Sequence, residues 1–590
     1  MGEHLTSLLL SFTLYLTLAV AFYGWGLALM RLARIELSPI HPRTILVWLG
    51  WAACLWLFQL LHLFLPLNLY VVLPVFLVGL AFGLKPVLLS ITRLVQDKQS
   101  RTYKALIIFI FLFIAAWLAS KSMQSPTIFD TGLYHLNTIR WINSYPIVPG
   151  LGNLDGHMAF NASFFTYDAA LNFFPVFNQG RAIANSFLFL LTLLSMLLYL
   201  RPALKKPALL WQSHPFRYLP ALLSLPILGY LVFKSEGFAS PTPDMSIFLL
   251  QLTLFVLWTR SAAAHFEGER QQLFGMFVII ILATTSITVK LSNVLFDLAF
   301  ILYGVLYLWV NYAGKLKVLL KPLIPAALIG LLWAGRGLIL SGAMFFPSTF
   351  LSFPFEWAVP EEAMISEANW IFSWARLPNV HWQAVLGNWD WLLPWLDANL
   401  GNLTLFSYPL AISIMLLGGV LLLGLKFKPS RPVWLEWSVL LPLVLVLLYW
   451  FFSAPDLRFA NASFFLLLVS TLLLFFAAAQ RTFKPKFYLL LFVLGVLIGN
   501  LQYLRIYALN FNTLADISWS GYQAVPQVAL TQVWTDSGLM LYTPRDGEQC
   551  WDAPLPCTPY VNLTLSLREA DDLSSGFVVT DYEDTRFSVP

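Results

Sequence analysis

The chain has 590 residues and a formal net charge of +5, with 59% hydrophobic and only 11% charged residues. Soluble globular proteins carry about 25% charged residues. The composition therefore excludes a soluble enzyme or binding module and predicts an all-α polytopic membrane protein, whose partners include the lipid bilayer and no nucleic acid.

The first apolar run, 5–29, predicts a transmembrane helix whose N-terminus lies outside the cell. No Lys or Arg precedes this run, whereas Arg31, Arg34 and Arg43 follow it. A cleavable signal peptide has the opposite arrangement, with a basic start and a small-residue cleavage site. We therefore expect the segment to remain as the first membrane helix.

Apolar runs of about the length that crosses a bilayer recur along the chain. They predict about 14 transmembrane helices within a membrane domain of residues 1–505. The runs are 5–29, 44–63, 68–90, 105–121, 182–200, 218–235, 244–259, 272–289, 293–310, 322–341, 405–425, 434–453, 459–480 and 487–505.

Lys and Arg residues concentrate in the short loops on one side of these predicted helices. Because such loops face the cytoplasm, the pattern places both termini outside. The basic loops hold Arg31/Arg34/Arg43, Arg93/Lys98/Arg101/Lys104, Arg201/Lys205/Lys206/Arg217, Arg260/Arg270, Lys315/Lys317/Lys321, Lys426/Lys428/Arg431 and Arg481/Lys484/Lys486.

Three long segments then fall on the outer side: the loops 122–181 and 342–404, and the tail 506–590. The tail has Val/Thr/Tyr runs broken by Gly and Pro, which predicts a small extracytoplasmic α/β or β domain. It also carries "CWDAPLPC", in which Cys550 and Cys557 predict a disulfide in an oxidising compartment. Two free thiols are the alternative.

The first outer loop contains "FDTGLYHLNTIRWI", which is typical of an amphipathic helix lying on the membrane surface. Asp130 begins it, and a half-desolvated carboxylate there is suited to accept a proton, so Asp130 is the candidate catalytic residue. The alternative is a helix cap. Tyr134, His135 and Arg140 follow as candidate substrate-binding residues; His135 could hold a phosphate, a hydroxyl or a metal, or be only a polar interface residue.

Three basic residues lie at the outer ends of three separate predicted helices: Lys290, Arg336 and Arg458. Charges at membrane depth are costly and usually functional. Together they could bind a lipid phosphate, and snorkelling to the headgroups is the alternative. Asp456 is a candidate for the same binding set, most simply as an ion-pair partner of Arg458.

Other polar residues leave their roles open. Asp244 begins a predicted helix and is by default its cap, and Asp297 lies inside another, where it could pack or relay protons. Asp155, His157 and Asp168 have ligand chemistry for a divalent metal such as Mg or Mn, but their spacing matches no strong motif. The second loop has a tryptophan cluster that could stack on sugars or form an interfacial belt. It comprises Trp370, Trp374, Trp382, Trp389, Trp391 and Trp395.

With "IFDTGLYH" in the first large outer loop and basic residues at later helix ends, the chain resembles the GT-C superfamily of integral-membrane glycosyltransferases. The strings "FDTGLYHLNTIRWI", "YPIVPGLGNL", "APDLRFA" and "CWDAPLPCTPY" also resemble a family of uncharacterised bacterial multi-spanning membrane proteins. Two features depart from GT-C proteins. The Asp loop follows the fourth predicted helix rather than the first, and Thr131 stands where an acidic neighbour of Asp130 is usual.

The GT-C resemblance implies transfer of a sugar from a polyprenyl-phosphate-linked donor to an extracytoplasmic glycan, lipid or protein acceptor, with inversion, in the bacterial inner membrane. Asp130 would be the general base, and the basic residues would stabilise the leaving phosphate. The alternatives are a polysaccharide polymerase or ligase, a transporter or flippase for a lipid-linked glycan, and an assembly factor. An ATP-driven pump or zinc protease is disfavoured, because the chain has no Walker A motif and no H-E-x-x-H.

Overall fold

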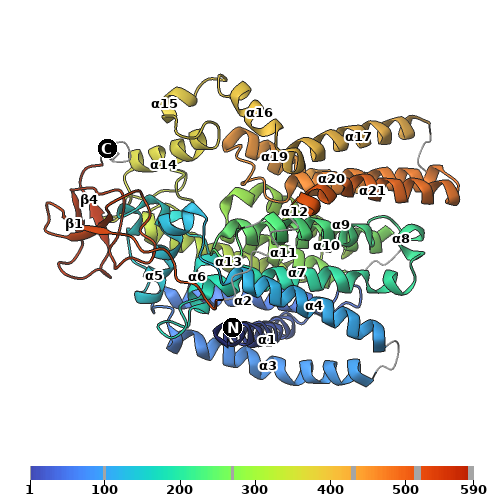
Figure 1. The fold of residues 1–590 in the computed structure, drawn as a ribbon, viewed down its shortest axis with the longest axis horizontal. Coiled ribbons are helices and arrows are strands. Elements are labelled where there is room, and N and C mark those ends of the chain that lie inside the picture. Colours follow the sequence, from blue (N-terminus) through green and yellow to red (C-terminus); the bar gives the residue numbers. More distant parts are fainter. Residues whose placement is uncertain are drawn as a thin grey trace.

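The computed structural model describes residues 2–96, 101–234, 236–266, 272–426, 434–509 and 520–582. Lys98, Arg270, Lys428 and Arg431 of the predicted basic loops lie outside these ranges, as do 510–519 and 583–590 of the predicted C-terminal domain. The described chain is mostly helical, and long helices run side by side across the molecule (Figure 1).

An apolar helix overlaps each of the fourteen predicted ranges. Within the described residues, nine helices are long and apolar enough to cross a membrane by length and composition, and five further apolar helices are shorter. The number of crossings therefore stays a prediction. The helices are α1 (Gly2–Ala33), α2 (Thr44–His62), α3 (Leu69–Gln96), α4 (Arg101–Ser122), α7 (Gly180–Lys205), α9 (Leu219–Lys234), α10 (Pro243–Phe266), α11 (Leu273–Val289), α12 (Val294–Asn311), α13 (Leu316–Ser341), α17 (Tyr408–Lys426), α19 (Leu441–Ser453), α20 (Ser463–Thr482) and α21 (Pro485–Leu509).

Small residues allow the first helices to approach closely. A Cβ added to Gly24 of α1 would lie 1.9 Å from the carbonyl oxygen of Gly79 in α3, and one added to Gly50 of α2 would lie 1.7 Å from that of Phe22 in α1. Helices in a membrane associate through such close van der Waals contact, because lipid offers them little hydrophobic driving force.

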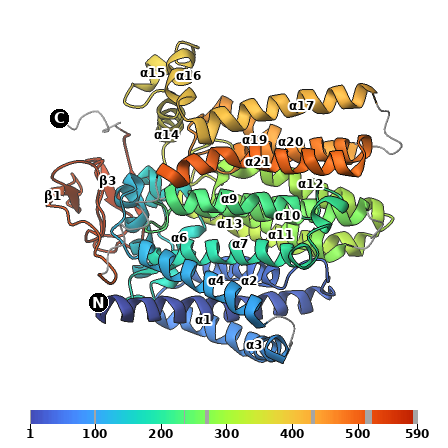
Figure 2. The same cartoon turned by 45° about the vertical axis from the view of Figure 1, so that its right-hand side comes forward.

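Short elements form the loop predicted to be the first outer loop, at the end of the bundle that also holds the start of α1. They are η1 (Thr131–His135, a π-helix), α5 (Leu136–Ser144), η2 (Leu151–Asn153), η3 (Gly156–Phe160) and α6 (Phe164–Leu171). The second loop forms α14 (Glu361–Trp374), α15 (Trp382–Val385), α16 (Leu392–Leu400) and the π-helix η5 (Leu403–Ser407). Figure 2 shows both loops and the C-terminal strands at this end. The remaining short helices are α8 (Leu209–Gln212), η4 (Leu291–Asn293), α18 (Trp434–Trp437) and η6 (Ser438–Leu440).

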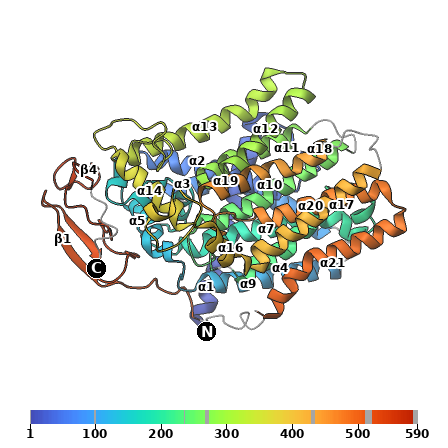
Figure 3. The ribbon, with the colours of Figure 1, turned by 90° about the horizontal axis from the view of Figure 1, so that it is seen from above.

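The C-terminal segment is built from strands, without a helix in residues 520–582. β1 (Leu530–Trp534) pairs antiparallel with β2 (Met540–Pro544), and β3 (Leu565–Leu567) pairs antiparallel with β4 (Phe577–Val579). The sequence left an α/β or a β domain open, and the described residues form the β alternative. Figure 3 shows these strands projecting beyond α5 and α14.

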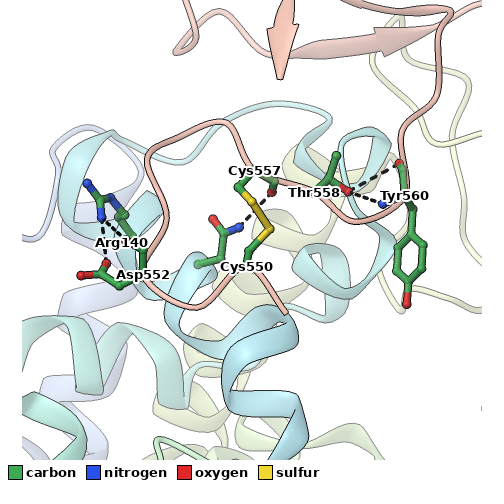
Figure 4. Close-up of a disulfide and its surroundings, with 7 residues drawn as sticks. Arg140, Cys550, Asp552, Cys557, Thr558 and Tyr560 are labelled. Atoms are coloured by element: carbon green, nitrogen blue, oxygen red, sulfur yellow. Dashed lines mark hydrogen bonds and ion pairs between the residues drawn. A yellow bond between two sulfur atoms is a disulfide. The ribbon is translucent and has the colours of Figure 1, made fainter. Parts of the chain in front are cut away.

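The strand region packs onto the first outer loop. Trp141, Leu151 and Met158 of that loop share an apolar cluster with Leu541 and Phe577 of the tail. Cys550 and Cys557 form a disulfide, and the loop between them lies on α5, where the side-chain amide of Asn137 donates to the Cys557 carbonyl at 2.9 Å (Figure 4). The tail therefore braces the segment that follows Asp130.

Gly132 is one of the close points of this docking. Its carbonyl accepts from the backbone N–H of Trp551 at 2.8 Å, and an added Cβ would lie 2.5 Å from the Trp551 ring. We expect Gly132→Ala to weaken docking by about 1–3 kcal/mol, because the indole must move. Hydrogen exchange of the backbone around Trp551 should then increase.

Gly335→Ala is the matched control, since nothing lies within 4 Å of a Cβ added there. It should leave exchange near Trp551 unchanged. Equal exchange in the wild-type chain and the Gly132→Ala variant would contradict the docking described above.

Candidate functional site

Asp130 lies at the entrance to the π-helix η1, in helical conformation. Its φ and ψ are −59° and −22°, and its side chain makes no capping hydrogen bond. Its Oδ2 instead accepts from Nη1 of Arg458 at 2.9 Å. The alternative of Asp130 as a helix cap is therefore wrong. π-helices are rare and occur frequently at functional sites.

Four charged side chains meet at this point. Arg458 lies in the loop between α19 and α20, and its Nε is 3.8 Å from Oδ2 of Asp244 in the first turn of α10. Nζ of Lys290, at the end of α11, donates to Oδ1 of Asp244. We call Asp130, Asp244, Lys290 and Arg458 the charge cluster; it combines two carboxylates with two cations.

The charge cluster is partly open to solvent. Its side chains are 24% exposed at Asp130, 17% at Asp244, 24% at Lys290 and 41% at Arg458. Burial lowers the pKa of the Arg458 guanidinium, but Asp244 and Asp130 outweigh it and hold that pKa above its ordinary value. Both carboxylates therefore stabilise the charged arginine.

Phe459 lies between the two cations. Its ring centroid is 4.5 Å from Nζ of Lys290 and 4.9 Å from Cζ of Arg458, within cation–π range. Asp456 was expected to form an ion pair with the Arg458 side chain. Its Oδ1 instead accepts from the backbone N–H of Arg458 at 2.8 Å. The guanidinium itself reaches Asp130 and Asp244.

A buried hydrogen-bond network joins the helices that present the charge cluster. The Gln251 side chain in α10 donates to Oδ1 of Asn293 at 2.6 Å and accepts from the backbone N–H of Ala462 at 2.8 Å. Asn293 donates in turn to Oδ2 of Asp297 at 2.9 Å. Asp297 thus has a packing role, and the network fixes the spacing of α10, α12 and the start of α20.

The second outer loop holds the backbone of the Arg458 loop. The indole N–H of Trp395 donates to the Pro455 carbonyl at 2.8 Å, and that of Trp450 donates to the Asp456 carbonyl at 2.6 Å. Trp391 and Trp395 are buried in one apolar cluster. Trp395 of this loop and Trp450 of α19 therefore position the arginine loop, whereas Trp374 and Trp389 are exposed.

Tyr134 and His135 lie beside the charge cluster. The Tyr134 ring stacks on His157 with centroids 5.1 Å apart, and burial, with Asp130 and Asp244 nearby, raises the pKa of its phenol. His135 is 1% exposed, and burial lowers its pKa to about 4. With this pKa His135 is neutral at physiological pH, so its imidazole offers hydrogen bonds rather than a positive charge.

Two predicted substrate-binding arginines lie elsewhere. Nη1 of Arg140 donates to the Asp552 carbonyl oxygen at 2.7 Å and to its Oδ1 at 2.9 Å, on the C-terminal domain (Figure 4). Nη1 of Arg336 lies 3.0 Å from Nδ1 of His62. Of the three basic residues grouped from the sequence, the structure joins Lys290 and Arg458 and separates Arg336.

Asp244 is the member of the charge cluster that sequence reasoning missed. A cap was its default interpretation, but the hydroxyl of Thr242 accepts from the Asp244 backbone N–H at 3.3 Å, so Thr242 is the capping residue. The sequence did contain a signal for this contact: an acid, Asp244, and a base, Lys290, lie at the predicted outer ends of two successive predicted helices.

The residues with metal-ligand chemistry make structural contacts. Oδ1 of Asp155 accepts from the backbone N–H of His157 at 3.0 Å and lies 2.9 Å from its Nδ1. Asp168 is buried, and burial raises its pKa to about 8 despite the opposing effect of Arg181. Within the described residues, no group of three or more His, Cys, Asp and Glu is arranged to hold a metal ion.

The low pKa of His135 predicts how the free energy of unfolding depends on pH. Its pKa is about 4 in the folded chain and about 6.5 when unfolded. Between these values the unfolded state binds more protons, so the free energy of unfolding falls as pH decreases from 6.5 to 4, by about 3 kcal/mol for this group. His135→Phe should remove that slope in detergent-solubilised protein unfolded chemically.

The comparison between the two proteins isolates His135, because Asp168 contributes the opposite slope to both. Above pH 7 the difference between wild-type and variant stability should be constant, which serves as the internal control. A difference that stays constant down to pH 4 would contradict the buried, neutral His135.

Comparison with known proteins identifies a family for this chain but no activity. No curated protein matches the chain, and no solved structure matches it. A family model described as a domain of unknown function, DUF8201, matches residues 8–465, which include the whole charge cluster. The chain belongs to the DUF8201 family.

Proposed function

We propose that this chain is an integral-membrane glycosyltransferase. It would transfer a sugar, with inversion, from a polyprenyl-phosphate-linked donor to an extracytoplasmic glycan, lipid or protein acceptor. The observation that carries the proposal is the 2.9 Å contact between Oδ2 of Asp130 and Nη1 of Arg458, which sets a carboxylate beside the basic ends of distant helices. GT-C enzymes, which the sequence resembles, use these two kinds of group.

Asp130 would act as the general base. One oxygen, Oδ2, is held by Arg458, and Oδ1 makes no hydrogen bond among the described residues. With 24% of its side chain exposed, Asp130 can accept the proton of an incoming acceptor hydroxyl. The acceptor oxygen would then form its bond to the sugar C1 as the bond from C1 to the phosphate oxygen breaks.

Lys290 and Arg458 would stabilise the phosphate as it leaves. The contacts of the Arg458 guanidinium with Asp130 and Asp244 use Nη1 and Nε, so Nη2 is available to a phosphate oxygen within the described site. Electrostatic stabilisation of this kind is usually the largest single contribution to catalysis. Negative charge develops on the leaving lipid phosphate, and these two cations offset it.

Asp244 would be a positioning residue. It contacts both Lys290 and Arg458 and holds the two cations together before substrate arrives. Two cations alone would repel one another, whereas the added carboxylate keeps them close at small electrostatic cost. A bound phosphate would share this role with Asp244.

Asp130→Asn tests the base. It keeps the shape of the side chain and one acceptor oxygen for Arg458, but it cannot take a proton. We expect kcat/KM for transfer to fall by about 10²–10⁴-fold. The assay uses purified full-length protein in liposomes and a panel of polyprenyl-phosphate hexoses and pentoses, with release of polyprenyl phosphate as the readout.

Asp552→Asn is the control, because it removes an exposed carboxylate of the C-terminal domain that pairs with Arg140 instead of Arg458. It should retain transfer. Full activity in Asp130→Asn would show that Asp130 is not the general base. Movement of the intact donor across the bilayer, with no phosphate release from any donor, would favour a flippase.

Arg458→Lys tests phosphate binding separately. Lysine keeps the charge but loses the planar fork that contacts Asp130 and Asp244 at once. We expect kcat/KM to fall by about 10²-fold, as for loss of one preorganised donor. Arg140→Lys, at the C-terminal domain, should have little effect; equal activity of the Arg458 variant and the wild type would exclude Arg458 from the site.

A further inference from the structure

Arg336 is a charged residue that lies outside the charge cluster. It lies near the outer end of α13 and is 3% exposed. Its Nη1 donates to the Gln59 carbonyl at 3.3 Å and to Nδ1 of His62 at 3.0 Å. A buried charge is stable only when it is paired or otherwise compensated.

His62 accepts from Arg336 but brings no negative charge. Its Nε2 lies 3.1 Å from the carbonyl oxygen of Tyr145, which can only accept, so Nε2 carries the hydrogen. Its Nδ1 faces a guanidinium, which can only donate, so Nδ1 carries the lone pair. The two contacts together fix the neutral tautomer of His62.

The surrounding chain supplies little other compensation. Among the described residues, Arg336 forms no ion pair with a carboxylate. Gln59 and His62 lie at the C-terminal end of α2, where the helix dipole offers roughly half a negative charge. Roughly half of the positive charge on Arg336 is therefore left for another group to neutralise.

A cavity adjoins this arginine. It has a volume of about 30 Å³, and Arg336, His62, Thr138 and Trp141 contribute to its lining, which contains no Asp or Glu among the described residues. Three potential donors of these residues are buried without a hydrogen bond: Nε of Arg336, Oγ1 of Thr138 and Nε1 of Trp141. Unpaired buried donors are costly, and the described residues around the cavity offer these three no acceptor.

We infer that this cavity is a binding site for a monatomic anion, chloride under ordinary conditions. The volume is roughly two to three times the ~10–15 Å³ that one water requires, which suits a single small anion. A chloride ion neutralises Arg336 and accepts from several donors at once. It would join α2, α5 and α13, and so help to fix the first outer loop against the membrane domain.

The test measures thermal unfolding of the purified full-length protein in detergent, with sodium gluconate replaced by sodium chloride at constant ionic strength. Ligands that bind only the folded state stabilise it. We expect the unfolding temperature to rise by several degrees and to saturate with chloride. Bromide should act similarly, inorganic phosphate should not, and crystals soaked in bromide should show an anomalous peak in the cavity.

Two variants assign the effect to the cavity. Arg336→Gln should abolish the chloride dependence, and Thr138→Val, which keeps the charge but removes one hydroxyl, should raise the half-saturating chloride concentration several-fold. Arg140→Gln is the control and should keep the wild-type dependence. Absence of a halide-specific shift in the wild type would overturn the inference in favour of bound water. A response to phosphate alone, or an unchanged response in Thr138→Val, would also overturn it.

Discussion

The ion pair between Asp130 and Arg458 is the contact on which the organisation of this end of the helix bundle, predicted to be its outer face, depends. It joins residues 328 positions apart in the chain, one after α4 and the other before α20. Near a membrane, an isolated carboxylate or guanidinium is expensive to desolvate. Each of these groups therefore stabilises the other, and Asp244 and Lys290 extend the same compensation to two further helix ends.

The rest of the outer structure holds these groups in place. The network through Gln251, Asn293 and Asp297 sets the spacing of the helix ends, and indole hydrogen bonds from Trp395 and Trp450 hold the backbone of the arginine loop. On the other side, the disulfide loop of the tail lies against η1 and α5. A site whose charges must shift between protein and substrate partners needs such rigid support.

The outer face thus offers two different electrostatic environments. The two cations of the charge cluster are already paired with carboxylates, so under the proposed function a phosphate shares them with Asp130 and Asp244. Arg336 is more deeply buried, with neutral acceptors only, and its cavity is small. These differences are why we assign substrate chemistry to the first environment and a structural anion to the second.

Much of the fold could be predicted from the sequence, because hydrophobicity and chain length decide which segments become membrane helices. Each of the fourteen apolar runs corresponds to an apolar helix, and the close spacing of Cys550 and Cys557 predicted their disulfide. Asp130, Lys290 and Arg458 were identifiable as polar groups at helix ends, since lipid tolerates few charges.

Only the tertiary structure decided which of these groups meet. Sequence position gives the depth of a residue along its helix but not the direction it faces or the neighbour it contacts. For that reason Arg336 was grouped with Lys290 and Arg458, Asp244 was interpreted as a cap, and Arg140 was expected at the substrate. Their actual partners, His62, Lys290 and Asp552, lie 274, 46 and 412 positions away in sequence. Packing of the helices and docking of the C-terminal segment bring them within hydrogen-bonding distance.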